Sequence, residues 1–301
     1  MGGREDLYRQ KLTVMPSETA CTNEIKIRAL FNRLQDTAGL AVEALEGSPS
    51  ELMRRGYAWV LLKYDLKVVK RLPSMDEDIV VETRHTPGDG FHTLRAFRVF
   101  NETNEAETLV LAKTSWVLID LAAGRPVRAG QHLPEVFSDV TDAPPIDPDF
   151  IAIPKLSGPK LKNEPILHQT SFPVRFHDLD ANGHVNNAVY FEWVYEATPL
   201  DLLGWSLREV HGEFRVSVKF GETVLVRVKE IREIGEIQER GEERGKQVFS
   251  EEEEEKEEGV KNAPSCRSFV YDMVETEDSP ERSMARFYAV WAPFGADKEN
   301  A

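Results

Sequence analysis

The stretch that decides the fold is Arg175-Phe176-His177-Asp178-Leu179-Asp180-Ala181-Asn182-Gly183-His184-Val185-Asn186-Asn187. It follows an extended run at Thr170–Phe176 and precedes a helical run at Asn187–Leu203. Short polar side chains around a glycine are typical of a loop that joins a strand to a helix. The free N–H groups at the start of such a helix stabilise a nearby anion.

The first half of the chain repeats this order at a shift of 160 residues. The shift aligns Val14 with Val174, Ile25 with Val185, Phe31 with Phe191 and Leu34 with Val194. An extended run at Arg9–Met15 leads to helical spacing of Leu30, Leu34, Ala38, Val42 and Leu45. Strand-like runs follow in both halves, at Ala58–Val69, Asp78–Thr86, Phe91–Phe100 and Glu107–Asp120, and at Glu213–Phe220, Glu222–Ile231, Ser265–Val274 and Arg282–Trp291.

This order predicts an α+β fold made of a duplicated unit, one helix against an antiparallel sheet. The proline-rich stretch 143–165 is expected to be a linker between a first domain, 1–142, and a second domain, 166–295. Glu230–Glu258 holds 13 Glu and 5 Lys or Arg, a net charge of −8. We therefore expect 235–263 to be a solvated, disordered insert in the second domain.

Composition excludes several classes of protein. The chain has 301 residues and a net charge of −15, which argues against binding duplex nucleic acid. No apolar run is long enough to span a membrane. Cys21 and Cys266 cannot form a disulfide framework and suit a cytoplasmic location. No phosphate-binding loop, dinucleotide motif or metal-like histidine pair is present, so we expect no cofactor and no metal.

Asp180, Asn182 and His184 are the candidate catalytic residues. An acid can orient or deprotonate water, an amide can donate without changing charge, and an imidazole can relay a proton. A loop that merely caps a helix would have the same composition. At the shift of 160 the other half carries Ala20, Thr22 and Glu24, which favours one catalytic half.

The motif from Asp178 to Asn187, followed by Tyr190 and Trp193, resembles that of the acyl-acyl carrier protein thioesterases. Three segments of the first half are also similar to this family: residues 58–61, 114–120 and 125–128. The resemblance implies two tandem hotdog domains, each a long helix wrapped by an antiparallel sheet. It also implies hydrolysis of fatty acyl-acyl carrier protein, which releases free fatty acid and terminates elongation, with Asp180, Asn182 and His184 as catalytic residues.

On this basis the acyl chain is expected in the first half. The expected tunnel is lined by Leu30, Leu34, Ala38, Trp59 and Trp116, although apolar residues of this kind are core residues first. Backbone N–H groups near Val185 and Asn186 are expected to hold the oxyanion. Docking of an acidic carrier protein would need a local basic patch, for which the candidates are Arg54, Arg55, Lys67, Lys70, Arg71, Lys155, Lys160 and Lys162.

One position departs from the family. A catalytic Glu is usual in the strand before a Gly-acid turn, but Ser217 stands there, and Glu213 is about 13 Å away along an extended strand. Two alternatives therefore stay open: an acyl-CoA thioesterase of the same fold, or a non-catalytic acyl-binding module. Chain-length preference and oligomeric state, a homodimer included, are also left open.

Overall fold

The computed structural model describes residues 7–43, 49–86, 91–132, 164–231, 266–275 and 283–294. The predicted linker, apart from Glu164 and Pro165, and the predicted acidic insert lie outside these ranges. No helix in the described part of the chain combines the length and the apolar character that a membrane span requires.

The first half forms the elements that the sequence predicts. Its strands and helices are β1 (Tyr8–Thr13), the 3-10 turn η1 (Pro16–Glu18), α1 (Ile27–Glu43), α2 (Pro49–Arg54), β2 (Tyr57–Val68), β3 (Asp78–Thr86), β4 (His92–Asn101), β5 (Asn104–Asp120), β6 (Arg125–Val127) and α3 (Ala129–His132). α1 buries the residues spaced by three and four along one face, Leu30, Leu34 and Ala38 among them. The short helix α2 was not predicted.

The second half consists of β7 (His168–Pro173), η3 (Phe176–Asp178), α5 (Asn187–Ala197), β8 (Trp205–Phe214), β9 (Thr223–Ile231), β10 (Arg267–Val274) and β11 (Ser283–Pro293). Two sequence-based predictions are wrong here. The helix ends at Ala197 rather than Leu203, because Pro199 disfavours a helical conformation at Thr198. The next strand is Trp205–Phe214 rather than Glu213–Phe220, since the apolar residues after Pro199 continued a helical spacing that the backbone does not follow.

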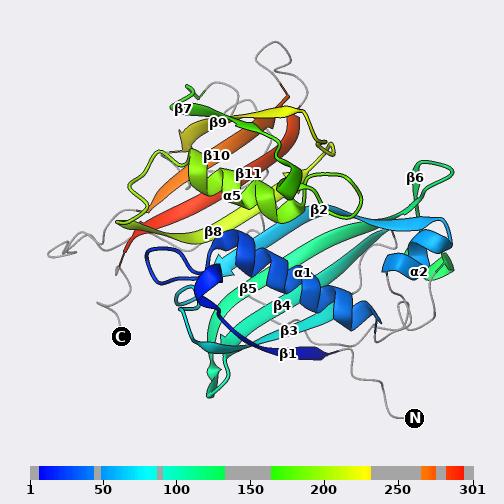
Figure 1. Cartoon of the computed structure of the whole chain (residues 1–301), viewed down its shortest axis with the longest axis horizontal. Helices are drawn as coiled ribbons and strands as arrows, with labels where there is room; N and C mark the ends of the chain where they lie inside the picture. Colours follow the sequence, from blue (N-terminus) through cyan, green and yellow to red (C-terminus); the bar gives the residue numbers. More distant parts are fainter. Residues whose placement is uncertain are drawn as a thin grey trace, which may run out of the picture.

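All the described strands join one antiparallel sheet in the order β1-β3-β4-β5-β2-β8-β11-β10-β9-β7, with β6 beside β5. The two halves meet where β2 pairs with β8. Both long helices lie on the same face of the sheet (Figure 1), and α1 packs against α5. Buried side chains from both halves form one continuous core beneath them. The architecture is a double hotdog, as predicted.

The duplication holds residue by residue at the shift of 160. β1 and β7, η1 and η3, and the first residues of α1 and α5 all differ by this number. Even the hydrogen bonds of the two loops correspond, because the Ala20 N–H donates to the Glu24 carbonyl and the Asp180 N–H donates to the His184 carbonyl, each at 2.8 Å.

Phe31 and Phe191 mark the pseudo-two-fold axis between the halves. These equivalent residues stack on each other, with ring centroids 3.6 Å apart and planes 17° apart. In a two-fold arrangement a residue meets its own counterpart only at the axis, so the axis passes between these rings. Beside them Tyr64 of β2 pairs with Gly212 of β8. A Cβ at Gly212 would lie 2.3 Å from the Phe287 ring, which explains the glycine.

A buried ion pair crosses the same junction on the other face of the sheet. His211 of β8 pairs with Asp65 of β2, and its Nδ1 lies 3.2 Å from the Asp65 carboxylate. Its Nε2 lies 3.6 Å from the Glu209 carboxylate. Burial lowers the pKa of His211, but these two carboxylates outweigh burial and raise it to about 9.

Because the folded pKa of His211 exceeds the ordinary value near 6.5, this pair stabilises the fold fully below about pH 6.5 and progressively less as pH rises towards 9. We expect the free energy of unfolding to fall by about 1–3 kcal/mol over this range. Denaturant titrations at several pH values would measure this. The His211→Gln variant should show a flatter profile, whereas His168→Gln, at an exposed position, should follow the wild type. Equal profiles for His211→Gln and the wild type would contradict the assignment.

Candidate active site

The loop before α5 is anchored by Asp178. Its side chain is fully buried, accepts the Arg175 N–H at 2.9 Å, and lies 2.8 Å from the Arg175 guanidinium. Burial raises the pKa of Asp178, but the bonds to Arg175 outweigh it and hold the pKa below its usual value. Glu18, its counterpart at the shift of 160, accepts the Met15 N–H in the same way. The anchoring acid therefore serves the fold in both halves.

Arg28 ties the first half to this loop. From the second residue of α1 it donates to the Glu192 carboxylate at 2.7 Å and to the His177 carbonyl at 2.9 Å. It also lies 3.5 Å from Asp178. Sequence reasoning missed this residue because nothing in its local pattern shows that the partner lies about half a chain away.

Asp180 organises the centre of the loop. One of its carboxylate oxygens accepts the N–H of Asn182 at 2.8 Å and that of His184 at 3.4 Å. The other oxygen accepts the Asn182 side-chain N–H at 3.3 Å. The acid and the amide are thus in contact, and His184 follows on the same turn with a half-buried ring.

The segment 217–219 runs beside His184. The Val185 N–H donates to the Val218 carbonyl at 2.9 Å, and His184 forms a β-bridge with Lys219. Ser217 is therefore close to the loop, at an exposed position. Glu213 is not, because it lies within β8 and contacts Lys63 and Arg215 at 3.3 and 3.1 Å. The strand β8 ends at Phe214, so Glu213 and Ser217 do not belong to one continuous strand.

The two N–H groups expected to hold an oxyanion already have acceptors. That of Val185 donates to Val218, and that of Asn186 donates to the Asp178 carbonyl at 2.8 Å. Asn186 instead caps α5, since its side chain accepts the Ala188 N–H at 2.8 Å. Neither N–H is available to an oxyanion in this conformation, because both fasten the loop to its surroundings.

The expected acyl-binding residues separate into two groups. Ala38, Trp59 and Trp116 line a cavity of about 160 Å³ beneath the C-terminal part of α1. Leu30 and Leu34 do not line it and lie fully buried in the main core. Among the described residues, no cluster of His, Cys, Asp and Glu could hold a metal ion.

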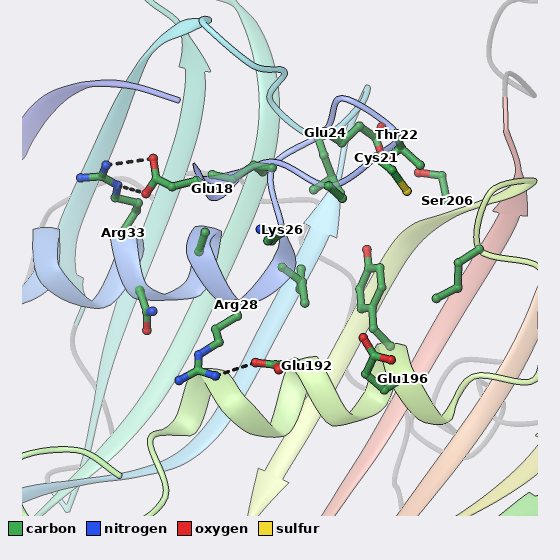
Figure 2. Close-up of a pocket in the computed structure, with 18 of the residues that line it drawn as sticks. Glu18, Cys21, Thr22, Glu24, Lys26, Arg28, Arg33, Glu192, Glu196 and Ser206 are labelled. Atoms are coloured by element: carbon green, nitrogen blue, oxygen red, sulfur yellow. Dashed lines mark hydrogen bonds and ion pairs between the residues drawn. The ribbon is translucent and has the colours of Figure 1, made fainter. Parts of the chain in front are cut away.

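A larger cavity of about 810 Å³ lies beside the other loop, between the start of α1 and the end of α5 (Figure 2). Ala20, Thr22 and Glu24 line it, the counterparts of Asp180, Asn182 and His184. Two ion pairs border it, Arg33 with Glu18 and Arg28 with Glu192, both drawn in Figure 2. Sequence reasoning did not predict this cavity, since no motif marks the loop that forms it.

Both halves match known domains of one family. Residues 5–137 match the acyl-ACP thioesterase N-terminal domain, and residues 162–262 match its C-terminal domain. The chain belongs to the acyl-ACP thioesterase family.

Similar proteins agree with this placement. A palmitoyl-acyl carrier protein thioesterase of Cuphea hookeriana is 28% identical over 65% of this chain and 48% of its own length. One from Arabidopsis thaliana is 26% identical over the same shares. The chain thus spans about half the length of these curated relatives.

Among solved structures, the 12:0-ACP thioesterase of Umbellularia californica superposes with a TM-score of 0.70 at 17% identity, covering 95% of this chain and 94% of that one. An oleoyl thioesterase (putative) of Lactobacillus plantarum gives a TM-score of 0.69 at 19% identity, covering 95% and 96%. These similarities support the double hotdog fold.

Within this acyl-ACP thioesterase family member, the two loops also share a left-handed backbone position. Gly183 has φ of +74° and its counterpart Asn23 has φ of +67°. Asparagine tolerates this conformation better than other residues with a Cβ. The Asn23 loop therefore indicates that asparagine can replace Gly183.

We expect Gly183→Asn to change the free energy of unfolding by less than about 0.5 kcal/mol, and Gly183→Ala to lower it by about 1 kcal/mol. No atom lies within 4 Å of a Cβ built at this position, so the difference reports backbone strain alone. Urea denaturation of both variants would measure it. Equal stability of the two would show that the loop does not hold Gly183 in this conformation.

Proposed function

We propose that the chain hydrolyses the thioester between a fatty acyl group and an acyl carrier protein, releasing free fatty acid and ending chain elongation. Family membership supports this proposal, but one observation carries it. The first-half loop keeps the same backbone hydrogen bond with Ala20 in place of Asp180. The fold therefore does not need the Asp180 carboxylate, and chemistry is the remaining reason for it.

In the proposed reaction the thioester lies at Asn182 and His184. Asp180 orients a water molecule and accepts its proton while the water oxygen attacks the carbonyl carbon. The side-chain amide of Asn182 and the positive end of α5 stabilise the oxyanion. The carbon–sulfur bond then breaks, and His184 gives a proton to the departing thiolate. The proton that Asp180 took from water replaces it on His184, so the products are a carboxylic acid and a free thiol and both side chains return to their starting states.

Ser217 is the position at which the second half departs from the family pattern. The usual Glu of the family is replaced there, so Asp180 has to act on the water without a second carboxylate. The same replacement motivates the alternative of a non-catalytic acyl-binding module. Stoichiometric binding of acyl-carrier protein without release of fatty acid would favour that alternative.

The proposed catalytic roles can be tested at matched positions in the two loops. We expect Asp180→Asn and His184→Ala to lower kcat on acyl-carrier protein by about 10²–10⁴, the range for loss of a general acid or base. Thr22→Ala and Glu24→Gln alter the counterparts of Asn182 and His184 and should leave kcat near wild type. Release of fatty acid by purified variants would be followed by mass spectrometry. Near wild-type rates for Asp180→Asn and His184→Ala would remove both roles.

The identity of the thiol carrier is a second open question, because four of the five candidate docking residues in the described part of the chain already contact other groups. Arg71 contacts Glu77 at 2.7 Å and Lys70 contacts Glu107 at 3.4 Å. Arg55 donates to the His132 carbonyl at 2.7 Å, and Arg54 pairs with Glu51. Lys155, Lys160 and Lys162 lie outside the described residues. An acyl-CoA thioesterase therefore stays the alternative.

We expect a higher kcat/KM for acyl-carrier protein than for the acyl-CoA of the same chain, with KM for the carrier rising as salt screens docking. Lys67→Ala should raise this KM, while Lys229→Ala in the second half serves as a charge-matched control. Equal kcat/KM on both carriers, with no salt effect, would contradict carrier-protein specificity. The predicted cytoplasmic location and a homodimer stay predictions, and the relatives named above are chloroplastic proteins.

A further inference from the structure

Four polar side chains help to line the cavity beneath α1, although the surface that the cavity exposes is mainly apolar. Ala38, Gly39, Val42 and the rings of Trp59 and Trp116 supply apolar surface. The remaining lining residues are Gln35, His85, Thr93 and Arg95. Among the described residues that line the cavity, only Arg95 carries a permanent charge.

The polar groups lie deep in the protein. Arg95 and His85 are each 7% exposed, and Thr83 and Thr114 behind them are almost fully buried. Arg95 donates to the Thr83 hydroxyl at 3.3 Å, and the Trp116 indole N–H donates to the Thr114 hydroxyl at 2.8 Å. Among the described residues, the buried Gln35 side-chain nitrogen has no hydrogen-bond partner. An unsatisfied buried donor of this kind is costly and indicates a site for an acceptor.

The fold itself does not require polar residues at the positions of Thr83, Arg95 and Thr114. His168 of β7 pairs with Val228, as Tyr8 of β1 pairs with Thr83, so Val228 is the counterpart of Thr83.

Following the strand pairing outward gives the other counterparts. Arg95 corresponds to Phe269, and Thr114 corresponds to Ala289. All three positions of the second half are apolar and almost fully buried. The same sheet thus also packs with apolar residues at these three positions, so the guanidinium is specific to the first half.

The charge of the cavity is permanent under physiological conditions. Burial, together with the nearby Arg95 charge, lowers the pKa of His85 to about 4. His85 is therefore neutral and offers one donor and one acceptor, while Arg95 stays cationic.

The pseudo-two-fold axis relates this cavity to the proposed catalytic loop. Glu24 and Tyr195 line one cavity together, and the Glu24 charge adds to burial in raising the pKa of Tyr195. At the shift of 160, His184 is the counterpart of Glu24, and Gln35 is the counterpart of Tyr195. By this symmetry we expect His184 to lie on the Gln35 side of α1, although His184 is not among the residues that line the cavity.

We propose that this cavity receives an acyl group bearing an oxygen function, a hydroxyl, keto or carboxylate group, and that Arg95 determines this specificity. The inference rests on the proposed thioesterase function. A volume of about 160 Å³ holds roughly five water molecules at ~30 Å³ each, which suits the polar end of an acyl group. A saturated chain would offer no acceptor to the Gln35 amide and no hydrogen bond to the guanidinium.

The test uses the full chain and carrier proteins loaded with decanoyl, β-hydroxydecanoyl, β-oxodecanoyl and sebacoyl groups, the last carrying a terminal carboxylate. We expect kcat/KM to be at least about tenfold higher for one oxygenated substrate than for decanoyl, because a polar site rejects an analogue that lacks the matching group. Arg95→Leu should abolish this preference, and Arg95→Lys should retain part of it. The preferred substrate identifies which oxygen-containing group the cavity recognises.

Thermal melts would establish that the variants fold. If Arg95→Leu does not, Thr93→Val at the half-buried rim provides the same comparison, with an expected loss of preference of several-fold. A wild type that prefers decanoyl, or an unchanged preference in the folded variants, would contradict the inference about Arg95 but not the proposed thioesterase function. Absence of hydrolysis on all four substrates would contradict the proposed function as well.

Discussion

The stack of Phe31 on Phe191 is the contact on which the arrangement of the halves depends. It joins α1 to α5 at the pseudo-two-fold axis, and Tyr64 packs edge-on against Phe31 with centroids 4.4 Å apart. Every cross-half contact is set relative to this axis. Arg28 reaches the second loop only because its helix crosses α5 here, and β2 meets β8 directly below. A shift of either ring would therefore displace the loop from the helix that covers it.

The two copies distinguish structural residues from functional ones without any other sequence. An acid that accepts a loop N–H occurs in both halves, as Glu18 and Asp178, and so belongs to the fold. The Asp180 carboxylate occurs in one half, although both loops keep the same shape. The same comparison on the sheet isolates Arg95, whose counterpart is Phe269. Residues that only one copy has are those that the shared fold does not explain.

Local patterns predicted most of this fold, because duplication supplied each half with an independent check. The start of α5 and the bounds of β3 follow from the shift and from alternation. The end of α5 and the position of β8 could not be predicted in this way, because the apolar residues after Pro199 fit both a helix and a strand. Asp180, Asn182 and His184 were proposed as catalytic from their chemistry, and their role stays a prediction. The use of the Val185 and Asn186 N–H groups depends on carbonyls outside the helix, which spacing does not predict.

Duplication within one chain also allows the two copies to specialise in a way that identical subunits cannot. In a symmetric dimer, an arginine beneath the helix would occur at both sites, as would every loop residue. Here the acid, amide and imidazole belong to the second half, while the cavity with Arg95 lies in the first half beneath α1. Both asymmetric features therefore involve α1, which covers the cavity and contacts the loop through Arg28. The first-half loop instead borders the larger cavity and carries Ala20 in place of the acid, so the cavity there is free of the proposed chemistry.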